Sequence, residues 1–196
     1  MMYNGRTVKQ WAGRSQWRAW RADLARAMAR SRSGWLSEGF WAITIYRIQQ
    51  ALKAARPRLL WLPLAVFFRI VKKMLTMVTH INLDRNAEIG PGLLIPHVGP
   101  IQVFPWAKIG ADCAIHHVCT VGAGSKPGGP VIGDHVMLGC HSCVLGPVTV
   151  GDGAQIGAGA VVVKDVPAWS TAVGVPAQVV NTREPEDSLC CTIQVP

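Results

Sequence analysis

The fold is decided by the stretch VIGDHVMLGCHSCVLGPVTVGDGAQIGAGAVV, residues 131–162, in which an aliphatic residue recurs at every sixth position. These positions are Ile132, Leu138, Val144, Val150, Ile156 and Val162. An amphipathic α-helix has a period of 3.6 residues and does not produce this spacing. A six-residue step of aliphatic residues, several of them followed by Gly, is typical of a hexapeptide β-helix.

The same step extends toward the N-terminus through eight further positions: Leu83, Ile89, Ile95, Ile101, Val103, Ile109, Ile115 and Val121. Each hexamer predicts a short strand and a turn, and three hexamers make one coil of about 18 residues. Stacked coils bury the aliphatic column that a single coil would leave in water. We therefore predict a mainly β fold, with a parallel β-helix over residues 81–180 and a separate tail at 181–196.

The repeat is interrupted at two places. Two residues are gained between Ile101 and Val103, and a Gly- and Pro-rich excursion at 123–131 separates Val121 from Ile132. Loops that leave a rigid solenoid often carry its binding function. We expect function at these interruptions.

Residues 1–80 form a different unit, because they lack the six-residue step. They hold 15 Lys and Arg against Asp23 and Glu38, a charge of +13, whereas residues 81–196 carry −4; together these give the net charge of +9. Their pattern predicts helices at about 7–30, 37–55 and 59–78. The Trp and Arg of these helices either pack on neighbouring elements or lie on an anionic membrane surface.

Several classes of protein are not expected. The longest uncharged apolar run, residues 59–68, is about half of what spans a bilayer. The first residues show no secretory signal, so we expect a cytoplasmic protein, with possible contact at the inner face of the membrane through residues 1–80. No nucleic-acid-binding motif accompanies the basic charge, and we expect no nucleic-acid partner.

The six cysteines do not form a disulfide or zinc framework. Cys113 and Cys119 fall at small interior positions, and Cys190 and Cys191 are adjacent in the tail. Cys140 and Cys143 form one C-x-x-C, but a zinc site of this type needs a second pair. The cysteine spacing therefore predicts no metal.

Three runs carry a resemblance to a known family: IGPGLLIPH at 89–97, IHHVCTVG at 115–122 and GAGAVVVKDVP at 157–167. They resemble the serine O-acetyltransferase branch of the hexapeptide-repeat acyltransferases, which includes enzymes of polysaccharide assembly. The resemblance implies a left-handed parallel β-helix and a homotrimer, or a multiple of one. It also implies that acetyl-CoA, as co-substrate, binds in the groove between two subunits.

The resemblance assigns His97 as the catalytic base. An imidazole suits this role because its unperturbed pKa lies near neutrality. His97 would accept the proton of an acceptor hydroxyl as that oxygen attacks the acetyl thioester, with no covalent intermediate. Without the resemblance, the alternative is a polar residue on a solenoid turn.

Counting coils places His117 one coil above His97, at about the 4.8 Å spacing of paired strands. The column continues to Cys140 and Ala158, and the neighbouring column holds Pro96, His116, Gly139 and Gly157. We expect His117 to assist His97 or simply to fill the column, and His116 to be a lesser candidate near the acceptor. Cofactor contacts are expected from Gly139, Gly157 and Ala158, with Lys164 facing a CoA phosphate. His80, His135 and His141 are expected at the surface.

The sequence departs from the family at the positions expected to hold the acceptor. Serine acetyltransferases carry Asp, Asp and an Arg-His pair where this chain has Asn82, Pro96 and, in the excursion, Gly128 and Gly129. A serine ammonium and carboxylate want charged partners. We therefore predict a neutral acceptor, a sugar hydroxyl of a surface polysaccharide or its precursor, contacted by Asn82. The alternatives are L-serine, as in cysteine biosynthesis, and a solenoid that binds without catalysis.

Overall fold

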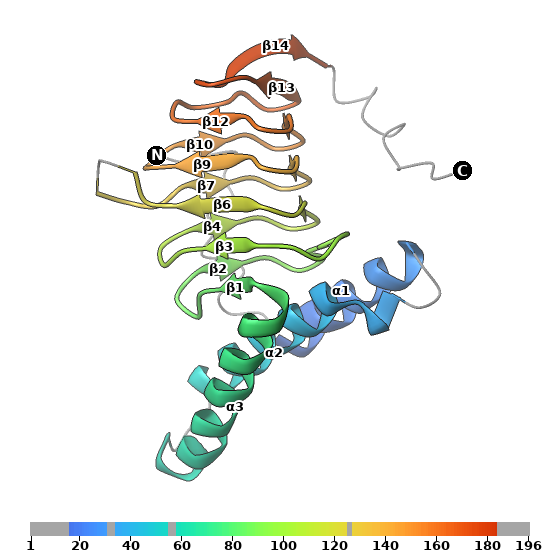
Figure 1. Cartoon of the computed structure of the whole chain (residues 1–196), viewed down its shortest axis with the longest axis vertical. Helices are drawn as coiled ribbons and strands as arrows, with labels where there is room; N and C mark the ends of the chain where they lie inside the picture. The colour runs from blue at the N-terminus through green and yellow to red at the C-terminus, as the bar shows by residue number, and fades with distance from the viewer. Residues whose placement is uncertain (1–15, 31–33, 55–57, 125–126, 184–196) are drawn as a thin grey trace.

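The computed structural model describes residues 16–30, 34–54, 58–124 and 127–183. Three α-helices lie at one end of a column of stacked coils, and the last strand closes the other end (Figure 1). The helices are α1 (Gln16–Arg30), α2 (Glu38–Ala54) and α3 (Arg58–Thr79), with a short 3-10 helix, η2, at Gly34–Leu36. The predicted β-solenoid with an N-terminal helical region is confirmed. The part of the first predicted helix at 7–15 lies outside the described residues.

Fourteen short strands of the described chain form three sheets that run along the column. The first sheet contains β1 (Ile81–Leu83), β3 (Ile101–Val103), β6 (Cys119–Gly122), β9 (Cys143–Leu145) and β12 (Val161–Val162). The second contains β2 (Glu88–Ile89), β4 (Lys108–Ile109), β7 (Val131–Ile132) and β10 (Thr149–Val150). The third contains β5 (Ala114–Ile115), β8 (Met137–Leu138), β11 (Gln155–Ile156), β13 (Ser170–Val173) and β14 (Gln178–Thr182). Strands pair in parallel, except that β14 runs antiparallel to β13.

The aliphatic column predicted from the six-residue step forms the core. In the first sheet, Leu83 pairs with Val103, Val103 with Val121, and Val121 with Val144. Each of these side chains is at most 2% exposed. The second sheet stacks Ile89, Ile109, Ile132 and Val150 in the same way, and the third stacks Ile115, Leu138 and Ile156.

Glycine follows many of these aliphatic residues because the next coil occupies the space of a side chain. A Cβ on Gly90 would lie 2.6 Å from the carbonyl carbon of Gly110, and one on Gly110 would lie 2.5 Å from the carbonyl oxygen of Gly133. Real Cβ atoms do not approach backbone this closely. The repeated aliphatic-Gly pair is thus a packing requirement of stacked coils.

The two-residue gain is accommodated before β3, not within it. Ile101 and Val103 are both buried on one three-residue strand, and they pair with Cys119 and Val121 of the next coil. The extra residues therefore lie in the corner segment 96–100, which contains His97. The described residues of the excursion, 123–124 and 127–130, belong to the loop beside β6 that leaves the column in Figure 1.

Helix α2 anchors the helical region to the first coil. It begins where the backbone N–H of Phe40 donates to Oγ of Ser37 at 3.3 Å, an N-cap that satisfies one free donor of the first turn. Gly39 lets the helix approach the solenoid, because a Cβ there would lie 2.8 Å from Cβ of Ile95. The hydroxyl of Tyr46 donates to the carbonyl of Ala87 at 2.8 Å.

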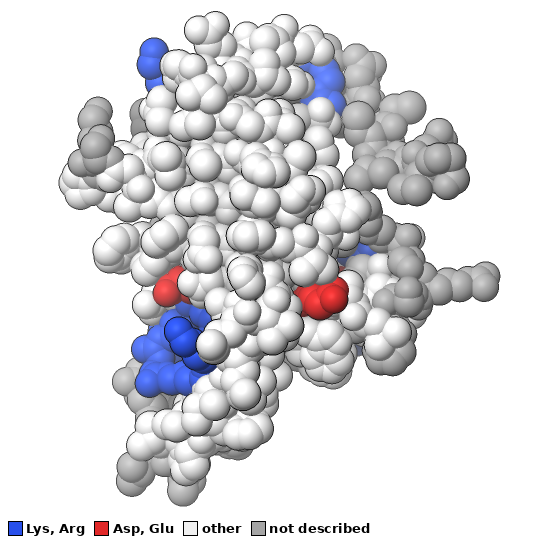
Figure 2. Space-filling model, in the orientation of Figure 1, with Lys and Arg blue, Asp and Glu red and all other residues white. Residues whose placement is uncertain are grey.

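The apolar side chains of the N-terminal helices pack on neighbouring elements only in part. Nε1 of Trp20 in α1 donates to Oγ1 of Thr44 in α2 at 3.0 Å. Helix α3, however, leaves large apolar side chains exposed, namely Leu62, Leu64, Val66, Phe67, Ile70, Met74, Met77 and Val78. Basic side chains gather below the solenoid on the face shown in Figure 2, whereas the coils above are largely uncharged. No helix of the described residues is long and apolar enough to cross a bilayer.

Candidate active site

Three histidines meet where the corner segment 96–100 passes the second coil. The ring of His97 lies with its centroid 5.9 Å from that of His116 and 6.1 Å from that of His117. His97 is exposed, while His116 and His117 are half-buried. We call these three residues the histidine cluster. It combines one solvent-accessible imidazole with two that are half-buried next to it.

The stacking of His97 and His117 follows from strand register. Leu94 forms a parallel bridge with Ala114, and the carbonyl of Leu94 accepts the N–H of Ile115 at 2.9 Å. This register aligns residue 97 with residue 117. The structure therefore brings together the two histidines that coil counting paired, while their chemical roles stay predictions.

Gly99 closes the corner over His117. A Cβ at residue 99 would lie 2.7 Å from Cβ of His117, and the φ of Gly99 is 151°. Both values disfavour any other residue at this position. Gly99 was missed from sequence, although its place in the two-residue gain was the available signal.

Two further side chains approach His117 from the third coil. The ring of His141 lies 5.8 Å from that of His117, edge to face. Leu138 pairs with Ile115, which aligns Cys140 with His117. His80, His135 and His141 are all exposed, as expected, but no pattern in the sequence indicated that His141 contacts the cluster.

Asn82, predicted to contact the acceptor, lies on β1 in the first sheet. Its side-chain amide donates to Oε1 of Gln102 at 3.2 Å. This pair is neutral and half-buried. A role of Asn82 at the acceptor stays a prediction.

The residues predicted to contact CoA divide into two kinds. A Cβ on Gly139 would lie 2.7 Å from the carbonyl oxygen of Ile156, and one on Gly157 would lie 2.6 Å from Cγ1 of Val173. Backbone stacking therefore requires glycine at residue 139, whereas a side chain at residue 157 would have to displace the partly exposed Val173. Ala158 and Lys164 are exposed and accessible to a ligand.

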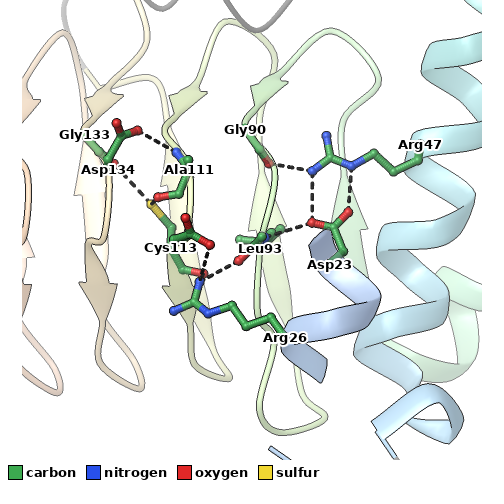
Figure 3. A network of polar contacts seen from close by, with 11 residues as sticks. Asp23, Arg26, Arg47, Gly90, Leu93, Ala111, Cys113, Gly133 and Asp134 are labelled. Carbon is green, nitrogen blue, oxygen red and sulfur yellow. Dashed lines mark hydrogen bonds and ion pairs between the residues drawn. The ribbon is translucent and has the colours of Figure 1, made fainter. Parts of the chain in front are cut away.

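Two arginines and one aspartate of the helices fix the coil that leads to His97 (Figure 3). Asp23 and Arg47 form an ion pair at 2.9 Å, and their side chains are 0% and 3% exposed. The Asp23 carboxylate also accepts the N–H of Leu93 at 3.0 Å, while Arg47 donates to the carbonyls of Ile89 and Gly90. Arg26 donates to the carbonyls of Gly92 and Cys113.

Burial sets the electrostatics of this network. Burial raises the pKa of the Asp23 carboxyl, and the Arg47 guanidinium opposes that rise. Burial also raises the pKa of the Cys113 thiol to about 12, so this cysteine is not a nucleophile at neutral pH. The network thus holds residues 89–94 rigidly without supplying a reactive group of its own.

Comparisons with known proteins agree with the fold and the repeat. Residues 129–164 match the family described as bacterial transferase hexapeptide (six repeats). The chain is 34% identical over 149 residues to a serine acetyltransferase of Helicobacter pylori strain J99, a match that covers 74% of this chain and 83% of that protein.

Two further serine acetyltransferases show how much of the chain matches known proteins. The chain is 35% identical over 150 residues to a serine acetyltransferase of Mycobacterium tuberculosis, covering 75% of this chain and 62% of that protein, so it spans less than two thirds of that relative. A solved serine acetyltransferase in complex with CoA has a TM-score of 0.72 and 27% identity, and the match covers 88% of this chain and 72% of that one.

Proposed function

The chain belongs to the serine acetyltransferase family of hexapeptide transferases, and we propose that it transfers an acetyl group from acetyl-CoA to the hydroxyl of L-serine. The family relationship supports both the reaction and the co-substrate. It favours the serine alternative over the polysaccharide acceptor that the sequence departures predicted.

His97 is the base in this proposal. Its imidazole removes the proton of the serine hydroxyl while that oxygen attacks the thioester carbonyl. The C–S bond then breaks, the acetyl group stays on the serine oxygen, and the thiolate of CoA takes up a proton. Backbone N–H groups or a side-chain donor would stabilise the oxyanion of the tetrahedral intermediate.

The other candidate residues support this step. His117 lies edge to face with His97, 6.1 Å between centroids, and orients its ring. The ring centroid of His116 is 5.9 Å from that of His97, and in this proposal His116 contacts the acceptor. Ala158 and Lys164 present exposed surface to the CoA chain and a phosphate, beside the glycines Gly139 and Gly157.

The observation that carries the proposal is the accessible imidazole of His97 on the corner segment that interrupts the repeat. A solenoid that only bound a ligand would not need an exposed imidazole backed by two half-buried ones at this interruption. The hydrogen bonds of Asp23, Arg26 and Arg47 hold residues 89–94, which lead to this corner. They favour a fixed catalytic geometry at His97.

One observation supports a second class of acceptor, a neutral hydroxyl. Asn82 occupies a family aspartate position, and its amide pairs with the neutral Gln102. A site with neutral groups at these positions offers less to a serine ammonium and more to a neutral hydroxyl. A sugar hydroxyl is therefore the second candidate acceptor.

Release of the CoA thiol distinguishes the two acceptors. The full chain is supplied with acetyl-CoA and either L-serine or a panel of neutral glycosides, and the acetylated product is identified by mass. The proposal predicts O-acetylserine, with a serine Michaelis constant in the ordinary range of about 1 μM to 1 mM. Transfer to a glycoside with no O-acetylserine would favour the second acceptor, and no thiol release with any acceptor would contradict both.

A further inference from the structure

His117, Cys140 and His141 form a second cluster, the metal-ligand cluster, on the side of His117 away from His97. One ligand atom from each of the three residues lies within 4.8 Å of the other two. We propose that this cluster binds one borderline-soft transition-metal ion, such as Zn²⁺, through two imidazole nitrogens and the Cys140 thiolate.

The fold builds this cluster from two adjacent coils. Strand β5 pairs with β8 so that Ile115 lies opposite Leu138, which brings Cys140 level with His117. The N–H of His141 donates to the carbonyl of His117 at 3.1 Å. The φ of His141 is 62°, a left-handed conformation that turns its side chain back to a ring distance of 5.8 Å from His117.

A second observation points to a ligand at His117. Its Nδ1 atom is buried and has no hydrogen-bond partner among the described residues. Buried side-chain polar atoms are satisfied in the large majority of cases, so this nitrogen calls for an explanation. Coordination of a metal ion through Nδ1 of His117 would give this nitrogen a partner.

The donor set selects the class of metal. Two imidazoles and a thiolate suit Zn²⁺ and its neighbours in the first transition row, whereas Mg²⁺ and Ca²⁺ take oxygen ligands. Donors at the usual zinc distances in a tetrahedron lie roughly 3.3–3.8 Å apart. The side chains therefore close by about 1 Å around the ion, and water takes the fourth position.

The C-x-x-C spacing predicted no metal because a second cysteine pair is missing. The fold instead brings two histidines to Cys140, while Cys143 belongs to β9 and is not part of the cluster. Cys140 binds as the thiolate, so the metal displaces the thiol proton into solvent and binding strengthens as pH rises. Cys143 is a matched control, because both cysteines are free and half-buried.

Occupation of the cluster has a consequence that rests on the proposed function. His117 contacts the ring of His97, and a metal on His117 fixes that ring and places a positive charge near the base. Metal loading should therefore inhibit acetyl transfer, and a chelator should reverse the inhibition. The metal is an inhibitor in this account and takes no part in the reaction.

Cobalt spectroscopy tests the site without an activity measurement. The reduced, chelator-treated full chain is titrated with Co²⁺ in the absence of oxygen, and absorption is recorded. We expect a thiolate-to-cobalt charge-transfer band and intense tetrahedral ligand-field bands that saturate at one ion per chain. The absence of a charge-transfer band in the parent protein would overturn the proposal.

Two ligand variants and one control variant test the ligand assignment. Cys140→Ser should lose the charge-transfer band, and Cys143→Ser should keep both the band and the affinity. His141→Asn, a replacement that tolerates the left-handed backbone, should weaken binding by more than the roughly 10–100-fold that loss of an outer-shell partner costs. A band that survives Cys140→Ser and disappears in Cys143→Ser would contradict the assignment.

The outcomes separate this inference from the proposed function. Cobalt binding with the predicted variant pattern supports the metal site even if the chain does not acetylate serine. Serine acetylation without cobalt binding removes the metal site and leaves the proposed function intact. Inhibition by Zn²⁺ that is equal in the parent and Cys140→Ser proteins would show that the inhibition arises elsewhere.

Discussion

Gly99 lies directly over His117, with its backbone placed where any Cβ would approach the histidine Cβ to 2.7 Å. The contact joins the corner segment of the first coil to the second coil, and it holds the exposed His97 beside the half-buried His117. The two extra residues of the repeat thus form a corner that covers His117 and leaves His97 exposed.

Gly99→Ala should therefore impair both stability and activity. The new methyl group pushes His117 or the corner segment away, and a displacement of about 1 Å in a reacting geometry can cost about 10²-fold in rate. The overpacked methyl group should also lower the free energy of unfolding by about 1–3 kcal/mol. Steady-state kinetics and chemical denaturation measure the two effects.

Gly159→Ala is the control for stability in this comparison. Gly159 has a φ of 70°, and a Cβ on this residue would have no atom within 4 Å, so only backbone strain of about 1–2 kcal/mol is expected. Equal losses of unfolding free energy in the two variants would show that the contact between Gly99 and His117 carries no strain.

The sequence was sufficient for the solenoid and for one of the site's contacts. The six-residue step placed Ile115 opposite Leu138, and counting from His97 reached His117, because stacking makes register additive. Gly99 was not found, because it lies in the corner where the two-residue gain breaks the repeat. The turn at His141 has a positive φ that recurs at the same place in other hexamers, at Asp112, Val118 and His135, but the repeat does not show which ring its side chain contacts. The acceptor roles of Asn82 and His116 stay predictions; Asn82 lies on β1 in the first sheet, where its side-chain partner is Gln102.

The buried pair of Asp23 and Arg47 should show strong energetic coupling. Replacing one partner leaves an uncompensated buried charge, and Asp23→Asn or Arg47→Met should each cost about 3–5 kcal/mol of unfolding free energy. The double variant should lose less than the sum of the two, with a coupling energy above about 1 kcal/mol by chemical denaturation.

The pair of Glu88 and Lys108 provides the matched control. Its charged atoms are 3.9 Å apart and its side chains are 44% and 38% exposed, so a coupling of only about 0–1 kcal/mol is expected in the cycle of Glu88→Gln and Lys108→Met. Coupling of similar size in both cycles would contradict the role given to Asp23 and Arg47.

Tyr46 should make the protein sensitive to alkaline pH. Burial raises the pKa of its hydroxyl to about 12 from 10.0. The folded state therefore keeps the proton that the unfolded state releases, and stability falls as pH rises from 10 through 12, by about 2–3 kcal/mol in all.

Tyr46→Phe should reveal this dependence. At pH 8 it should be less stable than the parent by about 1 kcal/mol, because the hydrogen bond to Ala87 is lost. By pH 11 the difference should vanish or reverse, as measured by urea unfolding at each pH. A difference that stays constant from pH 8 to pH 11 would rule out a raised pKa.

Assembly gives a fourth prediction. We expect a trimer or a multiple of one, because the family resemblance places the CoA groove between two subunits and a closed trimer has such a boundary beside every chain. Sedimentation at micromolar concentration should give a mass of three or six chains of 21.2 kDa. An active monomer under these conditions would show that one chain holds the whole site.

The role of His97 as the general base is tested by the single-turnover rate of His97→Asn. With saturating acetyl-CoA and serine, the rate should fall by about 10²–10⁴-fold, the usual contribution of a general base, while acetyl-CoA affinity stays unchanged. His135→Asn, at an exposed turn histidine, should keep the parent rate. A His97→Asn rate within about threefold of the parent would show that another group removes the proton from the serine hydroxyl.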